Sequence, residues 1–170
     1  GAEPGLLDRA PRPPNQPVFD RVMISETVVS GLFMGAVGYL FFAWMLDQGW
    51  AEHQARNALL LLLVLFENTH VFNCRSETRS IFRVPLSANW LLVGAVIISQ
   101  GAHILAMHLP GFNSVLRVEP VDIETWLLVA VIAASVILMM DLFKVVQRMV
   151  YPAPGVGGDG KRRTGSFPRK

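Results

Sequence analysis

Four apolar segments, each about as long as a membrane-spanning helix, constrain this chain more than any other feature of its sequence. They cover residues 22–46, 56–74, 88–109 and 125–143 of 170. A bilayer core of about 30 Å needs about 20 helical residues. Only 16% of the residues are charged, whereas a soluble domain carries about 25%. We therefore predict an all-α membrane protein with four transmembrane helices in residues 22–143.

Lysine and arginine are concentrated in three other parts of the chain. The proline-rich lead-in at residues 1–21 has three, the loop at 75–84 has three and the glycine-rich tail at 144–170 has seven. Because cytoplasmic loops carry the excess of these residues, both termini are predicted to be cytoplasmic. The lead-in is expected to be extended and the tail disordered. Basic residues could also contact anionic lipid headgroups.

The second segment contains an acid, Glu67, where a membrane helix should have none. A carboxylate near the bilayer centre costs at least ~2.5–3.5 kcal/mol, so it normally marks a site or a pathway. Counted from Arg56 at ~1.5 Å per residue, Glu67 lies roughly 17 Å along the helix, a little past the midplane. The alternative is a protonated acid that is hydrogen-bonded inside the bundle. We interpret Glu67 as a residue for cation or proton coupling.

Further candidate ligands lie close to Glu67 in the second segment. His70 follows at a spacing of three and Cys74 four residues later, so the three share one helix face. A hard cation such as Ca²⁺ would take Glu67, with Asn68 and oxygens from other helices. One helix supplies only two or three ligands, so the site would be incomplete within this chain.

A transition metal is the alternative occupant. It would use His70 and Cys74 together with His103 or His108 of the third segment. The ordinary role of buried histidines and lone cysteines is packing, however, and packing is the role expected here. Asn68 and His70 are therefore secondary candidates beside Glu67.

Three glycines, Gly31, Gly35 and Gly38, lie close to one face of the first segment. Small residues at such spacings let two helix backbones approach closely in lipid. Glycine is also simply common in membrane helices. We predict that this face packs against another helix.

The motifs of an ATP-hydrolysing domain are missing from the sequence. There is no Gly-rich phosphate loop of the Walker type and no Asp-Lys-Thr-Gly motif. No polar stretch is long enough for a nucleotide-binding domain, so this chain alone is not expected to hydrolyse ATP.

The sequence begins with Gly1 and has no visible signal peptide. We expect a fragment or a processed product of a longer chain, an expression artefact being the alternative. Nucleic-acid binding is not expected, since aromatic residues are not interleaved with the basic ones.

The stretch ENTHVFNCRSE, residues 67–77, resembles the eighth transmembrane helix of P-type cation-transporting ATPases, closest to the calcium-pump type. Other stretches agree in order and spacing. RPPNQP at 12–17 is similar to the cytoplasmic link before the seventh helix, NWLL at 89–92 to the start of the ninth, and DIETWL at 122–127 to the start of the tenth. The chain thus resembles helices seven to ten of such a pump.

The resemblance implies that Glu67 ligates the transported cation, with Ca²⁺ favoured. His70 stands where the sarcoplasmic-reticulum-type pump has an asparagine, so the resemblance does not determine which ion is bound. The family's other ligands come from helices that this chain lacks. The implied partners are therefore the remaining transmembrane helices and cytoplasmic domains, which use ATP and Mg²⁺, and the lipid bilayer. The loop at 47–55 is very short, unlike the long lumenal loop of the animal pumps, which implies a bacterial relative in the cytoplasmic membrane.

Two functions of other classes compete with the cation pump. One is a standalone four-helix membrane protein that binds a partner and transports nothing. The other is a small proton or metal carrier that uses Glu67, His70 and the third-segment histidines.

Overall fold

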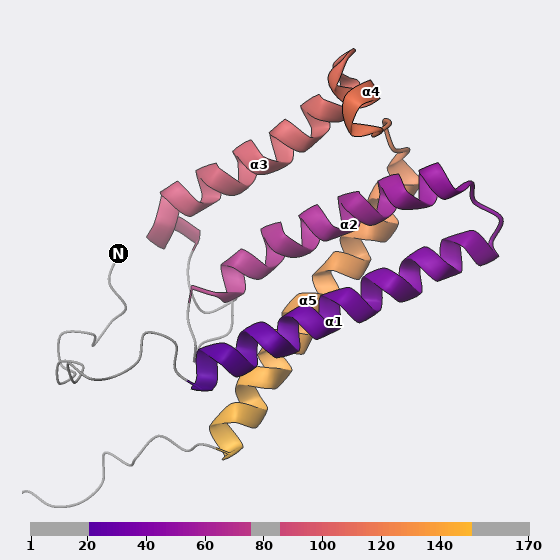
Figure 1. Cartoon of the computed structure of the whole chain (residues 1–170). Coiled ribbons are helices and arrows are strands. Elements are labelled where there is room, and N and C mark those ends of the chain that lie inside the picture. The colour runs from indigo at the N-terminus through magenta and orange to yellow at the C-terminus, as the bar shows by residue number, and fades with distance from the viewer. Residues whose placement is uncertain (1–20, 76–85, 151–170) are drawn as a thin grey trace, which may run out of the picture.

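The computed structural model describes residues 21–75 and 86–150, and every regular element within these ranges is a helix. The predicted all-α class is therefore confirmed for this part of the chain. The lead-in at 1–20, most of the arginine-containing loop at 76–85 and the tail at 151–170 lie outside the described residues. The elements, shown in Figure 1, are α1 (Arg21–Asp47), α2 (Glu52–Asn73), the 3-10 helix η2 (Leu86–Asn89), α3 (Trp90–His108), α4 (Phe112–Leu116) and α5 (Ile123–Val150).

The four predicted segments correspond to the four long helices, and the largest difference is at the end of α5. This helix continues to Val150, so residues 144–150 are helical rather than part of a tail. Val145, Val146, Met149 and Val150 extend the apolar sequence of this helix. Lys144 itself is buried. The loop predicted at 110–124 contains the short helix α4.

Among the described residues, α1, α3 and α5 are long and apolar enough to cross a membrane. The helix α2 has a sufficient length of 22 residues, but its second half is polar and lowers its mean hydropathy. A transmembrane position for α2 therefore depends on its neighbours and stays a prediction.

The helix α2 lies at the centre of the packing. In Figure 1, α1 and α2 run side by side in opposite directions, and α5 crosses behind both, in contact with each. The helix α3 lies beyond α2 and contacts it less, and Met107 is the buried side chain of α3. The core between α1, α2 and α5 consists mainly of Met45, Ala58, Leu61, Leu62, Phe66, Val129, Ala133, Val136 and Met140.

A tight turn brings α2 back along α1. Gly49 has φ +83°, a left-handed conformation that glycine adopts without steric cost. Its N–H donates to Leu46 O at 3.0 Å, and the N–H of Trp50 donates to Met45 O at 3.1 Å. These bonds satisfy carbonyls at the end of α1 and set the antiparallel pairing of the two helices.

Two hydrogen bonds connect Glu119, in the segment before α5, to Asn57 of α2. The Asn57 side chain donates from Nδ2 to Glu119 O at 2.7 Å and accepts from Glu119 N at Oδ1, at 3.3 Å. Asp122 caps α5 by accepting from the Thr125 backbone N–H at 2.8 Å and hydroxyl at 2.9 Å. These bonds from Thr125 hold the pKa of the Asp122 carboxyl below its usual value. The segment before α5 is thereby fixed against α2.

The three glycines of α1 differ in their surroundings. Gly38 is buried, and a Cβ there would lie 3.3 Å from Leu59 Cδ1 and 3.8 Å from Leu63 Cδ2 of α2. Gly31 and Gly35 are exposed, and a Cβ at either would have nothing within 4 Å among the described residues. Gly38 thus allows the close approach of α1 and α2, while packing at Gly31 and Gly35 stays a prediction.

Substitution of Gly38 by leucine is expected to destabilise the detergent-solubilised chain by ~1–3 kcal/mol, because the new side chain must displace Leu59. Gly35→Leu is the matched control, since it has open space in this chain and should not destabilise it, a helix-interior glycine being about 1 kcal/mol less favourable than a good helix former. Thermal unfolding followed by circular dichroism measures both. Equal unfolding temperatures for the two variants would contradict the observed packing of α1 on α2.

Candidate functional site

Glu67 lies in the second half of α2, and its side chain is exposed at the surface of the chain. The residue before it, Phe66, is completely buried against the core. One residue of helix turns the side chain by about 100°, so the packing that buries Phe66 directs Glu67 away from the core. The carboxylate therefore does not lie inside the bundle formed by the described residues.

The exposed side of α2 at Glu67 also carries Leu60 and Leu63, which are 41% and 39% exposed. Because Gly38 lies against Leu63 and the helices are antiparallel, Gly35 and Gly31 of α1 lie level with the part of α2 that contains Glu67. We call the exposed residues Leu60, Leu63 and Glu67 of α2, together with the exposed Gly31 and Gly35 of α1, the open face. It combines a carboxylate with a backbone that another helix could approach closely.

The described residues do not complete a cation site around Glu67. No group of three or more His, Cys, Asp or Glu side chains in residues 21–75 and 86–150 is placed to hold a metal ion. The prediction that Glu67 is one ligand of a site completed by other helices stays a prediction.

Asn68 makes a contact that the sequence did not reveal. Its Nδ2 donates to Gln100 Oε1 of α3 at 3.0 Å. This half-buried bond connects α2 to α3, and it gives the Gln100 amide a partner within the bundle. The polar character of Gln100 was the available signal, but its partner depends on how the two helices pack.

His70 and Cys74 contact each other, with His70 Nε2 at 3.6 Å from Cys74 Sγ. The third-segment histidines do not join them. His108 uses Nδ1 for a bond of 2.9 Å with Ile104 O, one turn back in α3. Within the described parts of the chain, the set proposed for a transition metal is therefore not assembled.

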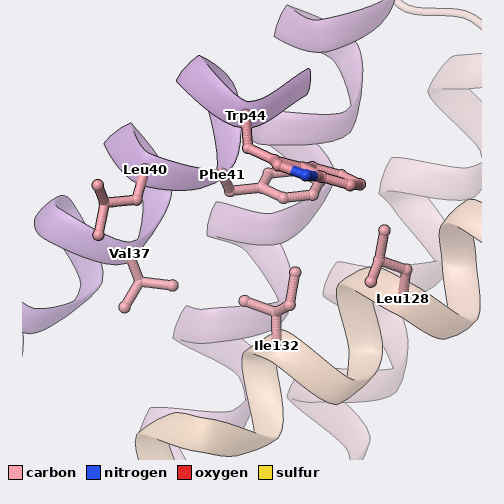
Figure 2. Close-up of a pocket in the computed structure, with 6 residues that line it drawn as sticks. All are labelled: Val37, Leu40, Phe41, Trp44, Leu128 and Ile132. Atoms are coloured by element: carbon pink, nitrogen blue, oxygen red, sulfur yellow. The ribbon is translucent and has the colours of Figure 1, made fainter. Parts of the chain in front are cut away.

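A separate groove lies between α1 and α5, and its lining side chains are aliphatic or aromatic. Its volume is about 360 Å³. The rings of Phe41 and Trp44 stack with centroids 6.1 Å apart on one side of it. Because such a lining offers no ligand to an ion, this groove is not a cation site. Figure 2 shows the lining residues Val37, Leu40, Phe41, Trp44, Leu128 and Ile132.

Comparison with known proteins relates the chain to cation-transporting ATPases. The family described as "Cation transporting ATPase, C-terminus" matches residues 1–146. The chain is similar to the "Probable cation-transporting ATPase F" of Mycobacterium tuberculosis and of Mycobacterium bovis, with 34% identity over 139 residues. That match covers 81% of this chain and 15% of each relative.

A fungal protein is a more distant relative. The "Endoplasmic reticulum calcium ATPase srcA" of Aspergillus fumigatus is 23% identical over 196 residues, covering 97% of this chain and 20% of that protein. The chain thus spans a small part, 15 to 20%, of the length of these relatives.

The bond between Asn68 and Gln100 predicts energetic coupling between α2 and α3. In a double-mutant cycle with Asn68→Ala and Gln100→Ala, we expect a coupling of about 0.5–1.5 kcal/mol, the range for such bonds between membrane helices. Denaturation of the detergent-solubilised chain measures it. A control cycle combines Asn68→Ala with Ser99→Ala, which changes the exposed neighbour of Gln100. In this cycle the two effects on the free energy of unfolding should add. Additivity in both cycles would contradict the bond.

Proposed function

The chain belongs to the cation-transporting ATPase family, whose C-terminal region it matches, and we propose that it supplies the last four transmembrane helices of a P-type cation pump. Its small share of the relatives' length supports a role within a larger protein. The remaining helices would complete the ion site, and the cytoplasmic domains would use ATP and Mg²⁺. The mycobacterial relatives favour the cytoplasmic membrane of a bacterium as its location.

Within this pump, Glu67 is proposed to be one ligand of the transported cation. The observation that carries the proposal is the position of Glu67 on the open face, outside the packing between α1, α2 and α5. A carboxylate at this depth would be costly against lipid, so the open face is better covered by other helices of the pump. Gly31 and Gly35 would then allow such a helix to come close to Glu67.

Ca²⁺ is the favoured cation. A carboxylate with oxygens from neighbouring helices matches the oxygen ligands that Ca²⁺ prefers. The fungal relative is named as a calcium ATPase, which supports the same choice. Asn68 and His70 are weaker ligand candidates, because Asn68 bonds to Gln100 and His70 contacts Cys74.

The proposed topology has four membrane crossings and both termini in the cytoplasm. The strongest support is the concentration of lysine and arginine in the lead-in, the loop at 75–84 and the tail. These three parts lie on one side only if α2 crosses the membrane. Its antiparallel packing along α1 and its contacts with α5 are compatible with that position.

The role of Glu67 is tested in the full-length pump with Glu67→Gln. We expect the Ca²⁺ concentration for half-maximal phosphorylation by ATP to rise about tenfold or more, because one charged ligand is lost. Glu52→Gln, at the exposed start of the same helix, should behave as the unmodified pump. Unchanged Ca²⁺ dependence in Glu67→Gln would refute the ligand role. Activation of the unmodified pump by Mn²⁺ or Na⁺ but not Ca²⁺ would refute only the choice of ion.

The topology is tested by labelling single cysteines with a membrane-impermeant thiol reagent. In intact cells, Gln48→Cys in a Cys74→Ser background should be labelled, because the turn between α1 and α2 is predicted to face outward. The native Cys74, which is exposed at the end of α2, should react only after permeabilisation. If α2 did not cross the membrane, Gln48→Cys and Cys74 would be labelled from the same side.

A further inference from the structure

Lys144 is a charged residue in an unexpected place. It lies in α5 with only 2% of its surface exposed, although the sequence placed it at the start of a basic tail. A buried ammonium group is costly unless it is paired and hydrogen-bonded. The contacts of Lys144 therefore indicate why the charge is kept inside the bundle.

The first contact is with the end of α2. Lys144 Nζ donates to Asn73 O at 2.8 Å, in a buried bond between residues 71 positions apart. Asn73 is the last residue of α2, and the last carbonyls of a helix lack partners within it. A cation at this end also interacts favourably with the helix dipole. Lys144 thus caps α2 from a neighbouring helix.

Two acids act electrostatically on the same ammonium group. Desolvation is the largest influence on Lys144, and the charges of Glu26 in α1 and Asp141 in α5 oppose it. We call Glu26, Asn73, Asp141 and Lys144 the lysine cluster. Its members come from α1, α2 and α5, and its hydrogen bond joins α5 to the last residue of α2.

The lysine cluster lies close to Glu67 along α2. Asn73 follows Glu67 by six positions, which corresponds to about 9 Å along the helix axis at 1.5 Å per residue. Between Phe66 and Asn73 no side chain of α2 is buried. The polar half of α2 is therefore held by Phe66 at one end, by Lys144 at the other and by the bond from Asn68 to α3 between them.

We propose that Lys144 is a positioning residue for cation binding, which fixes the end of α2 through Asn73 and thereby sets the orientation of Glu67. This inference rests on the proposed function, since it requires Glu67 to be a ligand. Without the cap, the last turns of α2 can rotate or fray, and the Glu67 carboxylate leaves the position that its partner ligands require.

The experiment measures Ca²⁺-dependent phosphorylation of the full-length pump. Lys144→Met is expected to raise the half-maximal Ca²⁺ concentration about fivefold, within the range for residues that act on a site without touching it. The maximal level of phosphorylated pump should be retained. Lys144→Arg, which keeps the charge and the donors, should recover most of the affinity. Arg148→Met removes a charge at an exposed position one turn further on and should have no effect.

The same change in a Glu67→Gln background distinguishes positioning from a general structural role. If Lys144 acts through Glu67, Lys144→Met adds no further shift once the ligand is gone. An equal shift in both backgrounds, or a loss of maximal phosphorylation without a shift, would overturn the inference. If Lys144→Met does not accumulate in the membrane, Lys144→Gln replaces it, and unaltered Ca²⁺ affinity in that variant overturns the inference equally.

Failure of the proposed function gives a different result. If Glu67→Gln itself leaves the Ca²⁺ dependence unchanged, the ligand role fails and the positioning role fails with it. If Glu67→Gln shifts the Ca²⁺ dependence while Lys144→Met does not, only the positioning role is overturned.

Discussion

A helix that is apolar in its first half and polar in its second can lie in a membrane only where other helices cover the polar half. This constraint applies to α2, and the other long helices are arranged around it. On one side α1 and α5 bury Leu61, Leu62 and Phe66. At its end, Lys144 of α5 binds the carbonyl of Asn73. The polar half is thereby held at both of its ends.

The same arrangement leaves Glu67 outside the core. Burial of Phe66 directs the next side chain away from the core, and Gly31 and Gly35 of α1 are exposed with open space at their Cα atoms. Together these features produce a surface that suits neither lipid nor water. Under the proposed function, this surface is where further helices of the pump would pack.

Much of this architecture could be predicted from the sequence. Segment length and hydropathy indicated the four long helices that the structure has in its described residues. The ends of the helices could be predicted less closely than their positions in the chain. Residues 144–150 carry both basic and apolar side chains, and only the burial of Lys144 shows why the helix continues. The partners of Asn57, Asn68 and Lys144 lie 62, 32 and 71 residues away in the chain. No local pattern specifies pairs so distant.

The sequence by itself determined the helical class, the order of the segments, the unusual acid in the second of them and the resemblance to cation pumps. These follow from side-chain hydropathy and from short motifs, which are properties of neighbouring residues. The tertiary structure decided which face of α2 is buried, that Gly38 rather than Gly35 meets α2, and that Lys144 caps Asn73. These depend on how helices cross and rotate against one another, because the same periodic pattern is compatible with several packings until the side chains of the neighbouring helices select one.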